Sequence, residues 1–308
     1  MNGQTYSLYG LRIRSEIKLH APLVGENKPD LTVLSGPPRE VPPEPAQGEL
    51  LCEISYAGGG AAHVRTDKGY VLRYFNTAEF HFNEELTTVM AHRDPRTATD
   101  LVPEFLTASV PAFKLLLSGR VVLHASAVVR NSLALGILAP SGGGKSTLAS
   151  LLCRNGFSCL TDDVLTFDWR DGNPWVRIGP AELRLRPGSV GLEGSTWAVQ
   201  RLTTDGRTAV TSLDDRPADG AQMAALITPE VSKECQEPQL TRMDPDQALS
   251  AILSHLRVAG WKETRALKRV FPEQVRLARD LPAYRLVVPW GAEGAQRAIR
   301  TLVDRLAF

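Results

Sequence analysis

The feature that most limits what this chain can fold into is a glycine-rich stretch near its middle. Residues Ala139-Pro140-Ser141-Gly142-Gly143-Gly144-Lys145-Ser146, here called the glycine loop, match G-x-x-x-x-G-K-[ST] except for Ala139 at the first position. An apolar run precedes the loop, and residues 146–154 carry leucines at helical spacing. Consecutive glycines let backbone N–H groups turn inward around phosphate oxygens, and the following helix adds the positive end of its dipole. The sequence therefore predicts a strand, a phosphate-binding loop and a helix.

Each position of the glycine loop has a role in this prediction. Lys145 would reach the β- and γ-phosphates, Ser146 would offer its hydroxyl to Mg²⁺, and Thr147 would cap the helix or act as a ligand beside it. The alternative is a plain glycine turn before a lysine, and the expected strand and helix on either side favour phosphate binding. The predicted nucleotide-binding residues in this stretch are Ser141, Gly142, Gly143, Gly144, Lys145, Ser146 and Thr147.

Two acids follow the next apolar run, Ser158 to Thr161, which we expect to form a strand adjoining the loop strand. This is the place of the carboxylate that holds the Mg²⁺ shell in nucleotide sites. Since one carboxylate is enough for that, Asp163 is predicted to orient metal-bound water and Asp162 to accept the proton of an attacking hydroxyl. The alternative for the pair is a cap on a turn or helix.

His124 lies in a predicted buried strand, Val121 to Val129, ahead of the loop strand. A single histidine in an apolar strand is more often a core residue with satisfied hydrogen bonds than a functional one. The pattern alone therefore favours a structural role.

Three segments together resemble the HPr kinase/phosphorylase family, and more closely its relatives found with peptide biosynthesis genes: Leu123-His124-Ala125, the glycine loop, and Leu160-Thr161-Asp162-Asp163-Val164. The resemblance is strong from Val121 to Asp168 and weak in the later chain. It implies an α/β fold with a P-loop kinase core related to phosphoenolpyruvate carboxykinase. It also implies ATP and Mg²⁺ as cofactors, and transfer of the γ-phosphoryl group to a serine hydroxyl of a protein.

The resemblance also implies roles for residues outside the glycine loop. His124 would lie beside Asp162, the catalytic base, while Asp163 would serve the metal with Ser146. Arg184 and Arg186 fall where such relatives carry a basic residue near the phosphates, and charges on a solvated strand are the alternative for them.

The sequence departs from HPr kinase proper in three places. Thr147 stands where the family has Glu, the glycine-containing signature that is tied to phosphorolysis has no clear counterpart, and the first half is a different β-rich domain. We therefore expect the kinase chemistry, but neither phosphorolysis nor HPr as the substrate.

The chain is predicted to have an N-terminal β-rich domain, residues 1–99, and a P-loop catalytic domain, residues 100–308. Short alternating runs separated by turns predict an antiparallel sheet between Tyr6 and Phe82, whose exposed edges would suit an extended peptide. Helices are predicted at residues 100–117, with a kink or break at Pro111, and at 245–256, 272–281 and 293–306. The polar segment Thr203 to Ala221 reads as a surface loop, with a mobile lid as the alternative.

Composition and charge exclude several classes of protein. Lys and Arg number 35 against 34 Asp and Glu, a net charge of +1, which argues against nucleic acid or a membrane surface as the partner. The N-terminal residues lack the apolar core of a signal peptide, and no apolar run approaches the roughly 20 residues of a membrane helix. The four cysteines form no C-x-x-C pair and read as reduced thiols, so we expect a cytoplasmic protein.

The function predicted from these features is an ATP-dependent kinase acting on a hydroxyl, the serine of a peptide or small protein. The alternatives are a P-loop ATPase or GTPase without an acceptor, and a module that senses nucleotide without turnover. No L-S-G-G-Q or N-K-x-D segment supports the first alternative. Self-assembly into a homo-oligomer is implied by the resemblance, without a heptad pattern to show it.

Overall fold

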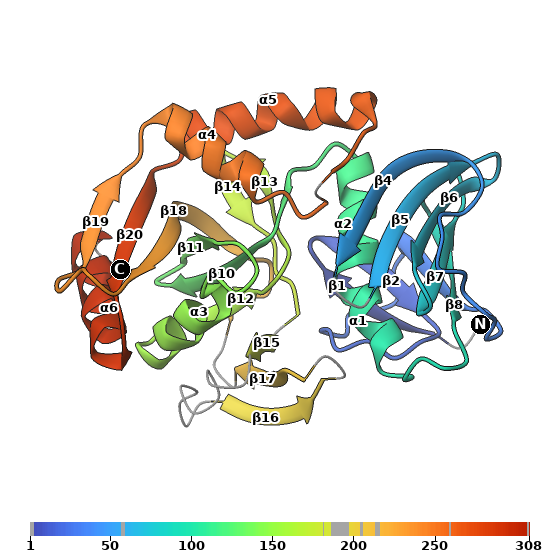
Figure 1. Ribbon diagram of the computed structural model, residues 1–308, viewed down its shortest axis with the longest axis horizontal. Coiled ribbons are helices and arrows are strands. Elements are labelled where there is room, and N and C mark those ends of the chain that lie inside the picture. The colour runs from blue at the N-terminus through green and yellow to red at the C-terminus, as the bar shows by residue number, and fades with distance from the viewer. Residues whose placement is uncertain are drawn as a thin grey trace. The chain divides into compact units, whose positions relative to one another are not determined.

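The chain forms two compact units, each described here by itself. The computed structural model describes residues 3–56, 59–180, 182–185, 197–203, 206–212, 216–258, 260–306 and 308. The first unit is Met1–Gly119 with Val258–Arg269, and the second is Arg120–Arg257 with Val270–Phe308. Figure 1 labels the helices and strands of both units.

An eight-stranded sheet forms most of the first unit, in the order β1-β2-β3-β8-β7-β6-β5-β4. The sheet is mixed, so the predicted antiparallel arrangement is wrong at β3, which pairs parallel with both β2 and β8. A long connection separates β2 from β3, so the chain can return before the next strand begins, whereas a short hairpin would force antiparallel pairing. The strands are β1 (Gln4–Leu8), β2 (Leu11–Ser15), β3 (Leu31–Ser35), β4 (Glu49–Tyr56), β5 (Gly59–Thr66), β6 (Gly69–Tyr74), β7 (Ala78–Phe82) and β8 (Thr88–Arg93).

Both edge strands of this sheet have backbone partners beyond the sheet. On β1, the Ser7 N–H donates to Pro22 O, and Thr5 O accepts from the Val24 N–H, each over 2.9 Å. On β4, Leu51 O accepts from the Lys262 N–H over 2.7 Å. The expectation of open edges ready to pair with a peptide is therefore wrong at these positions.

Helices α1 (Leu101–Thr107) and α2 (Ser109–Leu117) complete the first unit, although the sequence placed them with the second half. Their apolar side chains pack on the eight-stranded sheet, as in the stacking of Phe105 on Tyr74 with ring centroids 4.0 Å apart. The helical break falls after Thr107 and not at Pro111, because a proline removes the N–H that would bond four residues back. Thr107 O instead accepts from the Tyr9 hydroxyl over 2.9 Å.

The second unit contains a nine-stranded sheet and a small three-stranded sheet. The three strands of the small sheet lie between β14 and β18 in the sequence. The main path is β12-β10-β11-β18-β14-β13-β9, with β20 paired to β18 and β19, and the small sheet is β15-β17-β16. The strands are β9 (Val122–Leu123), β10 (Ala125–Arg130), β11 (Leu133–Leu138), β12 (Ser158–Thr161), β13 (Leu165–Arg170), β14 (Asn173–Val176), β15 (Glu182–Leu185), β16 (Trp197–Leu202), β17 (Thr208–Ser212), β18 (Ala221–Ser232), β19 (Gln239–Arg242) and β20 (Ala283–Pro289).

The loop strand β11 has β10 on one side and β18 on the other. The prediction that β12 adjoins β11 is wrong, because β10 lies between them and pairs antiparallel with both. β11, β18 and β20 run parallel. Their carboxyl ends therefore meet at one edge of the sheet, and the glycine loop leaves β11 at this edge.

Four helices belong wholly or partly to the second unit: α3 (Lys145–Arg154), α4 (Pro245–Ser254), α5 (Thr264–Asp280) and α6 (Ala292–Leu306). α3 and α6 share a buried core with β11, β18 and β20, which includes Leu148, Ile137, Ile227, Leu286 and Ile299. This core fixes the start of α3 directly after the glycine loop.

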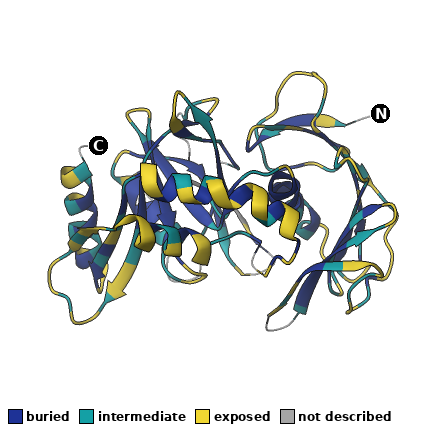
Figure 2. Ribbon diagram, turned by 90° about the horizontal axis from the view of Figure 1, so that it is seen from above, coloured by how far each residue is buried: buried dark blue, intermediate teal, exposed yellow. Residues whose placement is uncertain are grey.

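Two predicted boundaries in this half are corrected. α5 begins at Thr264, eight residues before Pro272, because its buried stripe already starts at Ala266 and Val270. Exposed and buried residues alternate along α5 in Figure 2. Pro272 is one of the exposed residues. The predicted loop from Thr203 to Ala221 contains a strand, β17, whose Ala209 and Val210 are buried. Among the described residues no helix combines the length and the apolarity needed to span a membrane.

Candidate functional site

At the residue before α3, the glycine loop has a backbone conformation that strongly favours glycine. Gly144, the residue before α3, has φ 87°, in the left-handed region. A Cβ on Gly143 would lie 2.9 Å from Pro140 Cδ, too close for any side chain. The loop therefore closes tightly over the end of β11 and leads directly into the first turn of α3.

Lys145 is buried at the start of α3, and its side chain folds back along the loop. Its ammonium Nζ donates to Ala139 O over 2.7 Å and lies 3.1 Å from His124 Nε2. Burial lowers the pKa of Lys145, against the opposing effect of Asp163 and Asp162. A desolvated ammonium at this place is a strong partner for an anion that enters the loop.

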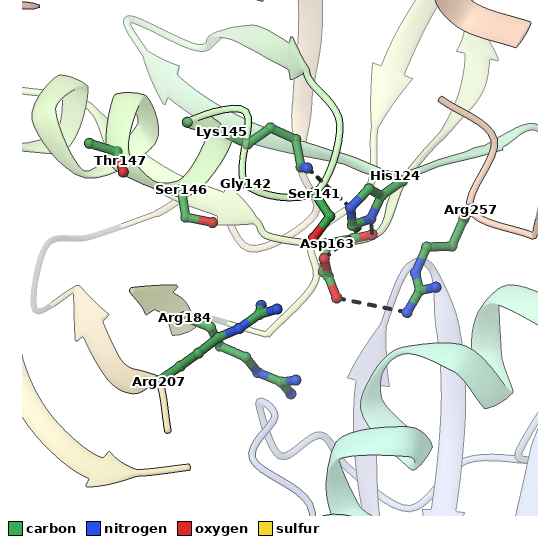
Figure 3. A pocket seen from close by; sticks show the side chains of 11 residues that line it. His124, Ser141, Gly142, Lys145, Ser146, Thr147, Asp163, Arg184, Arg207 and Arg257 are labelled. Atoms are coloured by element: carbon green, nitrogen blue, oxygen red, sulfur yellow. Dashed lines mark hydrogen bonds and ion pairs between the residues drawn. The ribbon is translucent and has the colours of Figure 1, made fainter. Parts of the chain in front are cut away.

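A cavity of about 220 Å³ opens over the loop and the first turn of α3. Its volume lies below the roughly 300–1,000 Å³ of pockets that enclose whole small molecules, so it suits a phosphate chain rather than a complete nucleotide. Four cationic side chains and one carboxylate converge on it (Figure 3). The lining residues are His124, Ser141, Gly142, Gly144, Lys145, Ser146, Thr147, Asp163, Arg184, Arg207 and Arg257.

Asp162 does not line the cavity and is surrounded by hydrogen-bond donors. Its carboxylate accepts from Ser126 Oγ over 2.5 Å, from Ser146 Oγ over 3.2 and 3.3 Å, and from the Arg184 backbone N–H over 3.2 Å. Burial, and then the charge of Asp163, raise the pKa of Asp162, while these donors oppose the rise. The carboxylate is thus held against the hydroxyl of Ser146.

Asp163 points the other way, into the cavity, because its backbone adopts φ 72°. Its carboxylate oxygens lie 3.2 Å from His124 Nδ1 and 3.7 Å from an Arg257 guanidinium nitrogen (Figure 3). Burial would raise the pKa of Asp163, but Arg257 and His124 together with Arg184 and Arg207 lower it. Asp163 is therefore ionised at neutral pH.

His124 bridges Lys145 and Asp163. Burial lowers its pKa to about 4, with Lys145 and Arg257 adding to the effect and Asp163 opposing it, so the imidazole is neutral at pH 7. Since the ammonium of Lys145 can only donate, Nε2 of His124 is assigned as the acceptor, and Nδ1 carries the hydrogen toward Asp163. His124 thus orders the two charged groups on either side of it.

Most of the predicted site residues lie together, with exceptions. Asp162 contacts Ser146, and only Asp163 of the two acids lines the cavity. Of the two predicted arginines, Arg184 lines the cavity and Arg186 lies outside the described residues.

Sequence reasoning missed three residues of the site: Ser126, Arg207 and Arg257. Arg207 precedes β17, where Thr203 holds its backbone through bonds of 2.7–3.1 Å. The segment that carries Arg257 pairs with β9, since the Arg257 N–H donates to Val122 O over 3.0 Å. No local pattern marks either arginine, whereas Ser126 could have been found, because it lies two residues after His124 within the strand predicted from Val121 to Val129.

The residues beside Ser146 fit a magnesium ion. The available metal ligands are the hydroxyl of Ser146 and the carboxylate of Asp162. Mg²⁺ prefers hard oxygen ligands, and it keeps waters and substrate phosphates as its other ligands. The described part of the chain contains no cluster of three or more His, Cys, Asp or Glu side chains able to hold a metal. A cation here would therefore be held by few protein ligands, Ser146 and Asp162.

Comparisons with known proteins give one structural relative to report. No family model matches the chain, and no curated protein matches its sequence. Among solved structures, the chain is similar to the Hpr(Ser) kinase/phosphatase from Coxiella burnetii, with 11% sequence identity and a TM-score of 0.33. The match covers 60% of this chain and 97% of that chain.

Proposed function

We propose that the protein binds a nucleoside triphosphate with Mg²⁺ and transfers the γ-phosphoryl group to a hydroxyl. The observation that carries the proposal is the cavity over the glycine loop, where four cations surround a single ionised carboxylate. The cations and the N-terminus of α3 suit a polyphosphate. A carboxylate among these cations would repel the phosphates, so we assign it another partner, an acceptor hydroxyl.

Each charged group has a part in this reaction. Lys145 binds the phosphate oxygens. Arg184, Arg207 and Arg257 neutralise the negative charge on the phosphoryl group as it is transferred. Asp163 accepts a hydrogen bond from the acceptor hydroxyl and takes its proton as the oxygen bonds to phosphorus. His124 contacts both Asp163 and Lys145 and so fixes the positions of their charged groups relative to each other.

The two acids thereby exchange the roles that the sequence suggested for them. Asp162 already accepts from three donors and does not line the cavity, so we assign the role of base to Asp163. Its contact with Ser146 instead suits the magnesium side, with the two residues as ligands. Mg²⁺ bound there would offset the negative charge of the phosphates.

The acceptor we propose is a serine of a peptide or small protein. This part is supported by the resemblance of the segments around His124, the glycine loop and Asp162 to the HPr kinase family. ATP as the donor, and a cytoplasmic location, are proposed on the same ground.

The test uses γ-labelled ATP with the purified protein and separates the label on free phosphate, small molecules and peptides. We expect labelled peptide with the parent, and a 10²- to 10⁴-fold slower transfer with Asp163→Asn, as for loss of a general base. Asp162→Asn should instead raise the Mg²⁺ concentration needed for half-maximal rate. Asp219→Asn, which removes an exposed carboxylate paired with Arg170 and Arg177, is the matched control and should act like the parent.

The outcomes separate this proposal from its alternatives. Label on free phosphate alone, with every acceptor tried, would favour an ATPase, and binding without turnover would favour a sensor. Transfer at the parental rate by Asp163→Asn would remove Asp163 as the base.

A further inference from the structure

His124, Ser126 and the two acids of the proposed site lie on one side of the loop strand. His124 and Ser126 come from the β9–β10 segment, and Asp162 and Asp163 follow β12. In the sheet order both lie on the β10 side of β11, whereas β18 and then β20 lie on the other side. A triphosphate whose γ end faces the acids would extend its α-phosphate and nucleoside toward β18 and β20.

β18 and β20 present apolar side chains on the face that carries α3. Ala225 and Ile227 of β18, and Leu286 and Val288 of β20, pack in the core shared with α3 and α6. Side chains alternate along a strand, so Val231 and Trp290 continue the same face beyond the reach of that core. Both are exposed, Val231 by 51% and Trp290 by 67%.

Trp290 is held in place by its backbone and by a neighbouring cation. Its N–H donates to Ser232 O over 2.9 Å, which extends the β18–β20 ladder by one step. The ammonium of Lys233 lies 5.1 Å from the centre of the indole ring, within reach of a cation–π attraction. At Gly291, with φ 94°, the chain turns away into α6.

The position of Trp290 suits the far end of a nucleotide. β20 lies two strand spacings from β11, roughly 10 Å across the sheet, and Trp290 continues β20 past the level at which β11 ends. α3 and α6 both begin at this edge, one after the glycine loop and the other two residues after Trp290. Ligands of parallel sheets bind outside the carboxyl ends of the strands, which is where this indole is exposed.

We infer that Trp290 is the platform on which the nucleobase stacks, with Val231 beside it, so that the ligand is a nucleoside triphosphate rather than an inorganic polyphosphate. The inference rests on the function proposed above, since it takes the phosphates to be in the glycine loop. An exposed indole is a suitable stacking partner because every nucleobase has a π face.

The test compares ATP with inorganic triphosphate, each with Mg²⁺, by calorimetric titration. Trp290→Ala should weaken ATP binding about ten-fold or more, as for loss of a stacked base, and leave triphosphate binding unchanged. Trp290→Phe should restore most of the ATP affinity, because it keeps an aromatic face. Phe271→Ala is the matched control, since it removes another exposed aromatic, 48% exposed on α5, and should change neither affinity.

The two proposals fail in different ways. If the parent binds neither ATP nor triphosphate, the phosphate site itself is refuted. If the parent binds both and Trp290→Ala leaves the ratio of the two affinities unchanged, the stacking platform is refuted while the phosphate site stands. An equal loss of both affinities in Trp290→Ala would also refute stacking, because the indole would then act through the fold.

Discussion

Replacing Ser126 by alanine should destabilise the second unit and weaken its magnesium site. The side chain is fully buried, and its hydroxyl donates to the Asp162 carboxylate over 2.5 Å. A hydrogen bond to a charged group contributes about 1.5–3 kcal/mol, and its loss leaves a buried carboxylate with fewer donors. For a unit of this size, that free energy corresponds to a melting temperature lower by roughly 3–12 °C.

The matched control is another buried serine. Ser150 on α3 is equally inaccessible, and its Oγ finds no hydrogen-bond partner in the part of the chain that the structure describes. Removing a buried hydroxyl that makes no hydrogen bond is neutral or stabilising, so Ser150→Ala should melt at or above the parental temperature. Thermal unfolding by circular dichroism, with and without Mg²⁺, measures both variants. Equal melting temperatures for the two variants would refute the role assigned to Ser126.

Three further predictions concern the loop and the cavity. Burial lowers the pKa of His124 to about 4, against about 6.5 unfolded, so the unfolded chain binds more protons between these values. The parent should therefore keep this contribution above pH 6.5 and lose roughly 3 kcal/mol by pH 4, and urea unfolding should show a smaller loss in His124→Gln. Gly144→Ala should cost roughly 1–2 kcal/mol, measured in the same way, because its φ of 87° is unfavourable for a Cβ that contacts nothing. Arg257→Gln should raise the pKa of Asp163 by removing the leading charge that lowers it, and so move the acidic limb of the kcat/KM profile to higher pH; an unmoved limb would contradict this.

The glycine loop and the strand and helix around it could be predicted because their physics is local. Three glycines, a lysine and a hydroxyl at fixed spacing specify a turn that leads into a helix, and the structure has β11 and α3 there. The break between α1 and α2 was local too. Its position was missed because a proline acts on the carbonyl four residues earlier, at Thr107, and not at its own position.

The partners of the two acids could not be predicted, since they depend on long-range pairing. Which carboxylate faces the cavity is decided by the left-handed backbone of Asp163 and by the donors around Asp162, from β10, α3 and β15. Arg257 reaches the cavity only because residues 255–257 pair with the strand segment before His124. The order of the strands, with β10 between β11 and β12, could not be predicted either, because local sequence patterns do not show which strands pair.

The most direct test of the phosphate site is a crystal structure of the protein with a non-hydrolysable ATP analogue and Mg²⁺. We expect phosphates wrapped by residues 140–146, with the terminal one facing Asp163 and a cation at Ser146 and Asp162. A glycine loop left empty while the analogue binds elsewhere, or phosphates bound with both acids turned away from them, would contradict this expectation.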